Sequence, residues 1–152
     1  MRKALVVGGA SGIGLTIATQ LAAREDYAAI HIVDRAQVPE DMVHEKFECH
    51  LFDLTSQDYG FFDRFMDIDT LMITAGFGHL ALFKDLSEDY IINMMNVNAV
   101  AVMRLIRRFY DRIASSDDFY CGVMVSIAGF MSSPFFSVYG ASKAALKIFI
   151  ES

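Results

Sequence analysis

The sequence has no tryptophan, and only two prolines and two cysteines occur among its 152 residues. Pro39 and Pro134 both fall in expected loops, so proline interrupts none of the expected helices or strands. Cys49 and Cys121 lie in apolar runs, which favours buried thiols in a reducing compartment over a disulfide. We therefore expect a cytoplasmic protein.

Basic residues are also few. The chain has 13 Lys and Arg and 19 Asp and Glu, which gives a net charge of −6. This acidic balance argues against nucleic acid or an anionic membrane surface as a partner. The chain is 54% hydrophobic with a mean hydropathy of +0.35, so it can bury a sizeable core. We expect one folded domain over residues 1–152.

A long uncharged stretch covers residues 4–23 and superficially resembles a signal peptide or a membrane span. Four glycines interrupt it, however, at positions 8, 9, 12 and 14, and Thr16, Thr19 and Gln20 add polar groups. A buried strand, a glycine turn and a helix explain these residues better than a continuous apolar block.

Short apolar runs alternate with helical patterns along the whole chain. The expected strands are 4–7, 30–33, 47–52, 70–74 and 123–126, and the expected helices are 13–24, 58–66, 87–114 and a last one from about 138. This alternation is typical of a parallel sheet covered by helices on both faces. The predicted fold class is α/β, a doubly wound Rossmann-type sheet with ligands at the carboxyl ends of the strands.

Two apolar surfaces in this pattern lack an obvious cover. The segment 90–106 is apolar almost all round, so either a neighbouring helix of the same chain or a second subunit should cover it, and a homo-oligomer through 87–114 is expected. The last helix has no terminating residue, and strand 123–126 would lie at the sheet edge. We expect further C-terminal strands and a substrate-covering segment in a longer natural protein.

A glycine-rich turn follows the first expected strand and opens the first expected helix. Gly8, Gly12 and Gly14 allow a tight turn and a close approach of a pyrophosphate to helix N-terminal amides. Asp34 ends the second strand, where a ribose-binding carboxylate is expected in a dinucleotide fold. Its charge favours NAD, although the neighbouring Arg35 could hold the extra phosphate of NADP, which stays the alternative.

Six short motifs in this order resemble those of the short-chain dehydrogenase/reductase family. They are "VGGASGIG" (7–14), "FDL" (52–54), "ITAG" (73–76), "NVNAVA" (96–101), "VSIAG" (125–129) and "YGASK" (139–143). The chain departs from the family pattern at Val7, where a threonine is usual, and at Ile73 and Thr74, which replace two asparagines. The resemblance implies a cofactor site formed by Gly8, Ser11, Gly12, Ile13, Gly14, Asp34, Arg35, Asp53, Leu54, Thr74, Ala75, Gly76, Tyr139 and Lys143.

The last motif places Tyr139 and Lys143 one helical turn apart on the same face. A free phenol has a pKa of about 10, too high for a general base at neutral pH, but a nearby ammonium stabilises the phenolate. Ser126 would orient the substrate oxygen, and the resemblance implies that Asn98 holds a water that links Lys143 to solvent. The predicted activity is reversible oxidation of an alcohol to a carbonyl.

Two other functions are also compatible with parts of this pattern. A dinucleotide sensor without turnover would keep the fold but would need none of Ser126, Tyr139 and Lys143. An epimerase or dehydratase on a related fold is disfavoured by the glycine spacing. The four histidines, at positions 31, 44, 50 and 79, show no paired ligand spacing, so no metal site is expected. His79 could touch a substrate, whose identity the sequence leaves open.

Overall fold

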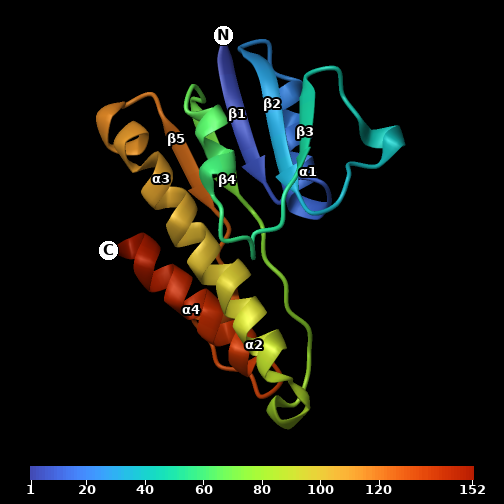
Figure 1. Cartoon of the computed structure of the whole chain (residues 1–152), viewed down its shortest axis with the longest axis vertical. Helices are drawn as coiled ribbons and strands as arrows, with labels where there is room; N and C mark the ends of the chain where they lie inside the picture. The colour runs from blue at the N-terminus through green and yellow to red at the C-terminus, as the bar shows by residue number, and fades with distance from the viewer. The chain divides into compact units, whose positions relative to one another are not determined.

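The computed structural model describes residues 1–152, which divide into two compact units. The first unit contains residues 1–75 and 108–123, and the second contains residues 76–107 and 124–152. Figure 1 shows the helices and strands of both units.

The first unit contains a five-stranded parallel sheet in the order β3-β2-β1-β4-β5. The strands are β1 (Arg2–Val7), β2 (Tyr27–Asp34), β3 (Phe47–Leu51), β4 (Thr70–Ile73) and β5 (Tyr120–Val123). The order reverses between β1 and β4, which is the topological switch point where open α/β sheets bind ligands. The structure confirms the predicted Rossmann-type α/β fold.

Both faces of this sheet are covered (Figure 1). Helix α1 (Gly12–Ala22) packs on the face that carries Val6 and Ile32, both buried. The 3₁₀ helix η2 (Gly60–Phe65) supplies the buried Phe62 and Phe65. The short η1 (Glu40–Met42) belongs to the loop that connects β2 to β3. Because side chains alternate along a strand, neighbouring strand residues enter opposite sides of the core.

The second unit is helical. Helix α2 (Glu88–Met95) continues through a π-helical turn, η4 (Asn96–Val100), into α3 (Ala101–Ser115), whose residues from Arg108 onward belong to the first unit. The remaining elements are η3 (Phe83–Asp85), η5 (Ile127–Gly129) and α4 (Ser137–Glu151). Ser87 caps α2, because its hydroxyl accepts a hydrogen bond from the backbone N–H of Tyr90.

The fifth strand and the second helix differ from the sequence prediction. A strand was expected at 123–126, whereas β5 ends at Val123, paired with Ile73, the last residue of β4. Residues 124–126 have no partner strand at that level, so the ladder stops. The helix expected at 58–66 is only the six-residue 3₁₀ helix η2.

The apolar segment 90–106 is covered in part by the same chain. Met94 and Leu105 are buried, and α4 packs against α2 within the second unit (Figure 1). Ile92 and Val100 remain 55% and 42% exposed. A neighbouring helix therefore covers only part of this surface. No helix of the chain is both long and apolar enough to span a membrane.

Candidate active site

The glycine turn after β1 adopts a backbone that other residues rarely adopt. Gly8 has φ +86° and Gly12 has φ +51°, and they are the only residues of the chain with positive φ. A Cβ on Gly12 would meet no atom within 4 Å, so this glycine is required by conformation rather than by crowding.

Gly14, in contrast, is required because the surrounding atoms leave no room for a side chain. A Cβ at this position would lie 2.1 Å from the Gly8 oxygen and 2.5 Å from the Thr74 hydroxyl. The Thr74 hydroxyl lies 3.1 Å from the Val7 oxygen and 3.0 Å from the Gly8 oxygen, and donates to this pair. Thr74 therefore braces the glycine turn at a position where the family pattern has asparagine.

The amino end of α1 suits an anionic group. Ser11 precedes the helix but its side chain makes no capping hydrogen bond, and the first turn carries no acidic residue. Ser11, Gly12 and Ile13 are all exposed. The helix therefore presents its positive end to solvent beside the open space at Gly12, an arrangement that fits a dinucleotide pyrophosphate.

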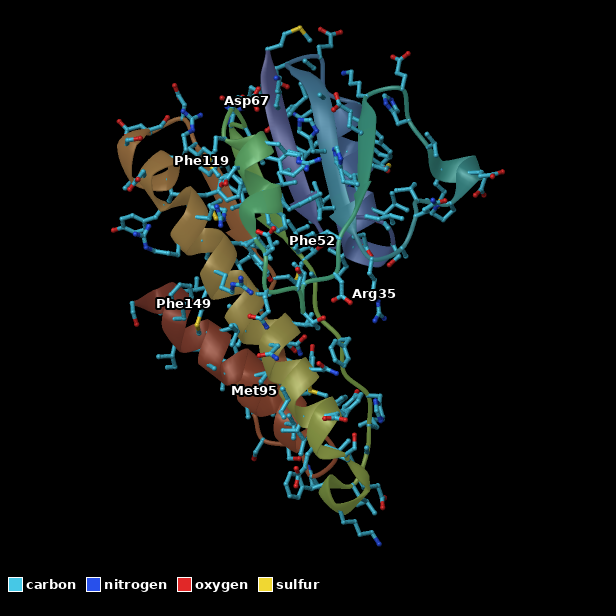
Figure 2. All side chains as sticks on the ribbon, viewed as in Figure 1. Arg35, Phe52, Asp67, Met95, Phe119 and Phe149 are labelled. Carbon is cyan, nitrogen blue, oxygen red and sulfur yellow. The ribbon has the colours of Figure 1, made fainter.

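Asp34 connects the glycine turn to the end of β2. Its carboxylate accepts hydrogen bonds from the backbone N–H of Ala10 at 3.0 Å and of Ala36 at 3.1 Å. Arg35, the next residue, is exposed and extends away from the strands (Figure 2). Asp34 therefore has a structural role beside its predicted contact with the ribose.

Asp53 and Leu54 follow β3 in the predicted adenine-binding segment. One carboxylate oxygen of Asp53 accepts hydrogen bonds from the N–H and the hydroxyl of Thr55, both at 2.8 Å, and these lower the pKa of Asp53. The Leu54 carbonyl accepts a hydrogen bond from the Tyr59 hydroxyl at 2.8 Å. Ala75 continues from β4 and donates its N–H to Val7 at 3.1 Å. Contacts of these residues with a cofactor stay a prediction.

The predicted catalytic residues Ser126, Tyr139, Lys143 and Asn98 all belong to the second unit. Lys143 is only 3% exposed, and its Nζ donates to the Met124 carbonyl at 3.3 Å. The same Nζ lies 5.9 Å from the centre of the Tyr139 ring. Tyr139 is half-buried on the preceding turn of α4. The helix therefore places the buried Lys143 amine next to a half-buried phenol ring.

Asn98 lies in the π-helical turn and is fully buried. Its side-chain oxygen accepts from the N–H of Phe77 at 2.9 Å, and its amide donates to the Phe77 carbonyl at 2.8 Å and the Ser142 hydroxyl at 3.0 Å. The side chain thus ties the segment after β4 to α4, so its direct effect is to position these two elements. The predicted water relay from Asn98 to Lys143 stays a prediction.

Ser126 precedes η5, and its hydroxyl accepts a hydrogen bond from the N–H of Ala128 at 3.2 Å. The η5 turn lies against α4, since a Cβ on Gly129 would be 2.8 Å from the Lys143 carbonyl oxygen. Ser126 is half-buried. Its predicted role, to orient a substrate oxygen toward Tyr139, is not tested by these contacts.

Two glycines after β4 approach the predicted catalytic side chains. A Cβ on Gly76 would lie 3.1 Å from Lys143 Nζ, and one on Gly78 would lie 2.4 Å from the Tyr139 ring. The resemblance pointed to Gly76, but sequence reasoning missed Gly78. The only available signal was the glycine pair in "GFG" at 76–78.

We expect the burial of Lys143 to destabilise the folded protein. Desolvation lowers the pKa of Lys143 below its ordinary value of 10.5. The protonated lysine therefore destabilises the folded state at neutral pH, and this penalty is relieved as the pH rises from the lowered pKa toward 10.5. We expect Lys143→Met to raise the free energy of unfolding at pH 7 by about 1 kcal/mol. Urea unfolding at pH 7 and pH 10 measures this gain, which should shrink at the higher pH.

The matched control for this substitution is Lys147→Met on the same helix. Lys147 pairs with Glu151 at 2.6 Å on a more exposed face, so its loss should change stability by less than about 0.5 kcal/mol. A Lys143→Met variant less stable than the wild type at pH 7 would contradict the predicted burial penalty.

A family model described as short chain dehydrogenase matches residues 2–152. The chain belongs to the short chain dehydrogenase family. Among curated proteins, an uncharacterized short-chain type dehydrogenase/reductase of Sinorhizobium fredii is 34% identical over 153 residues, covering 96% of this chain and 60% of that protein. Human 17-beta-hydroxysteroid dehydrogenase type 1 is 34% identical over 85 residues, covering 56% of this chain and 26% of that protein.

Solved structures of the family share the fold. A 3-oxoacyl-[acyl-carrier protein] reductase from Brucella melitensis in complex with NAD has a TM-score of 0.79 and 28% identity, covering 98% of this chain and 65% of that one. A ketone-specific alcohol dehydrogenase from Comamonas testosteroni has a TM-score of 0.87 and 24% identity, and the match covers 99% of this chain and 65% of that one. This short chain dehydrogenase chain therefore spans less than two thirds of the length of these relatives.

Proposed function

We propose that this protein is an NAD(P)(H)-dependent oxidoreductase that interconverts an alcohol and a carbonyl. The observation that supports this most is Lys143, a cation kept almost fully buried without an ion-pair partner, one helical turn from Tyr139. Burying a charged lysine costs folding free energy unless the charge is paired. An unpaired buried lysine is therefore more readily explained by a catalytic role than by a structural one.

In the proposed reaction the cofactor carries the hydride, and the side chains transfer the proton and position the substrate. A bound nicotinamide would supply the hydride acceptor for oxidation and the hydride donor for reduction. Tyr139 takes the hydroxyl proton during oxidation and gives it back during reduction. Lys143 stabilises the Tyr139 phenolate, and Ser126 donates a hydrogen bond that holds the substrate oxygen. Asn98 keeps the backbone at Phe77 fixed against α4.

The alternative is a dinucleotide-binding sensor or scaffold without turnover. One experiment on the whole protein distinguishes the enzyme from the sensor. NADH binding is measured by fluorescence, and reduction of a panel of ketones is then assayed. We expect binding together with turnover of at least one ketone. Binding without turnover across aliphatic, steroid and acyl-chain ketones would favour the sensor.

We propose NAD as the preferred cofactor, with NADP as the alternative, because the Asp34 carboxylate would repel a 2′-phosphate. The structure allows its charge to be tested apart from its bracing role. Asp34→Asn keeps an oxygen that can accept from Ala10, whereas Asp34→Ala leaves that N–H unpaired. We expect Asp34→Asn to raise kcat/KM with NADPH relative to NADH by about tenfold or more, because the repulsion between the Asp34 carboxylate and the 2′-phosphate is lost.

Asp34→Ala should show the same shift in cofactor preference, together with weaker binding of both cofactors because the glycine turn loosens. Steady-state kinetics with both cofactors measure these effects. An unchanged NADPH/NADH ratio in both variants would remove the proposed role of the Asp34 charge.

The cellular setting and assembly are part of the same proposal. We place the protein in the cytoplasm, because Cys49 and Cys121 are both free thiols, as is usual in a reducing compartment. Cys121 is half-buried, whereas Cys49 is exposed and not buried as its apolar neighbours predicted. We also propose a homo-oligomer through the 87–114 helical segment, where Ile92 and Val100 remain exposed.

A further inference from the structure

Two histidines and a glutamate of the first unit lie together on one face of the sheet. The parallel register places His31 of β2 opposite Glu48 of β3, and His50 follows two residues later, opposite Val33. Side chains alternate along a strand, so Glu48 and His50 point to the same face. We propose that His31, Glu48 and His50 bind one divalent transition-metal ion, and that Zn²⁺ is the ion that fits them best.

The distances suit a shared ion after small side-chain movements. One ligand atom from each residue lies within 4.8 Å of the other two, and His31 Nδ1 lies 3.2 Å from Glu48 Oε2. Around a tetrahedral zinc with bonds of about 2.1 Å, ligand atoms lie about 3.4 Å apart. His31 Nδ1 and Glu48 Oε2 are already close to that separation. Glu48, with a side chain 56% exposed, is free to rotate toward the ion.

The two histidines offer lone pairs that nothing else in the chain uses. His31 Nδ1 and His50 Nε2 are buried and make no hydrogen bond. The contact between His31 and Glu48 is close enough for an ion pair but lacks hydrogen-bond geometry. Buried polar nitrogens without partners cost stability, and a bound ion would satisfy both.

The surroundings of this cluster resemble the apolar shell of a protein metal site. The Phe65 ring lies 5.1 Å from each histidine ring, and Phe61 lies 6.3 Å from His50. The other charged groups that influence the two histidines are Lys3, Asp67 and Arg64. Lys3 and Asp67 form an ion pair with each other, so the effects of their opposite charges on His31 largely offset one another.

The donor set decides the class of ion. Two imidazole nitrogens and one carboxylate oxygen suit Zn²⁺ and related first-row ions, whereas Mg²⁺ and Ca²⁺ prefer oxygen ligands. An ion here would connect the edge strand β3 to β2, with water completing its coordination. The site would therefore stabilise the sheet edge. It uses none of the residues proposed to act in oxidation and reduction.

Zinc binding by the whole protein tests this inference. Protein freed of metal by a chelator is titrated with Zn²⁺ against a chromophoric competitor, and Co²⁺ is added separately to follow its visible absorption bands. We expect one ion per chain, bound at least about tenfold more weakly by Glu48→Gln and by His50→Gln. Circular dichroism checks whether both variants fold, and Glu48→Gln changes only an exposed side chain.

Two control variants define the donor set. His44→Gln removes a histidine outside the cluster, and Cys49→Ser removes the thiol that lies between Glu48 and His50 on β3. Both should bind Zn²⁺ as the wild type does. The inference is overturned if the wild type binds no Zn²⁺, if Glu48→Gln and His50→Gln bind it equally well, or if Cys49→Ser abolishes binding.

Discussion

Replacing Tyr139 by phenylalanine is expected to lower kcat for ketone reduction by about a thousandfold, within the range for a lost general acid. The phenylalanine ring retains the contacts of Tyr139 with Gly78 and with Phe136, whose ring centre lies 5.3 Å away. Only the hydroxyl is lost, so NADH affinity should stay within about twofold of the wild type. Steady-state kinetics and NADH fluorescence titration measure the two quantities.

Tyr90→Phe is the matched control for this substitution. Tyr90 also belongs to the second unit, and its hydroxyl is hydrogen-bonded to His79 Nδ1. His79 is a predicted substrate contact, so loss of this bond should affect KM more than kcat. Comparable kcat values for wild type and Tyr139→Phe would remove the proton-transfer role of Tyr139. An equal fall in kcat for both variants would indicate a general effect on packing.

Features that depend on local sequence could be predicted well. The order of strands and helices followed from hydrophobic alternation, because each strand of a covered parallel sheet is a short apolar run. The glycine turn followed from Gly8, Gly12 and Gly14, and positive φ at the first two agrees with that reasoning. Tyr139 and Lys143 lie on one helix, so their adjacency needed only the helical repeat.

Features that depend on pairing between distant segments could not be predicted. His31 and Glu48 meet through the register of β2 and β3, which hydrophobic patterns do not determine. Spacing along the chain therefore gave no sign of their cluster with His50. For the same reason the end of β5 was misplaced, since it depends on where β4 ends.

The roles of single side chains were also only partly visible in the sequence. Asp34 was expected to bind ribose, but its hydrogen bonds show that it also holds the glycine turn. Thr74 replaces a family asparagine and still braces that turn through its hydroxyl. Asn98 was expected near a water, whereas its amide is occupied by Phe77 and Ser142. These roles depend on backbone groups, which motifs do not specify.

Gly14→Ala is expected to have the largest effect on the first unit. The added methyl would lie 2.1 Å from the Gly8 oxygen and 2.9 Å from the Gly8 carbonyl carbon, and backbone atoms cannot rotate away. The resulting shift should cost about 3 kcal/mol or more of unfolding free energy, at the upper end for overpacking. It should also displace the Thr74 hydroxyl and the amino end of α1, so NADH binding should fall with stability. Urea unfolding and NADH titration measure both effects.

Gly12→Ala separates crowding from backbone conformation. Its methyl would enter open space, so the penalty comes only from φ +51° and should be about 1 kcal/mol. If the close approach of Gly14 to Gly8 holds the turn together, Gly14→Ala must be the more destabilised variant. Equal losses in the two variants would show that positive φ alone controls the turn. A larger loss for Gly12→Ala would contradict the packing of α1 against the Gly8 carbonyl.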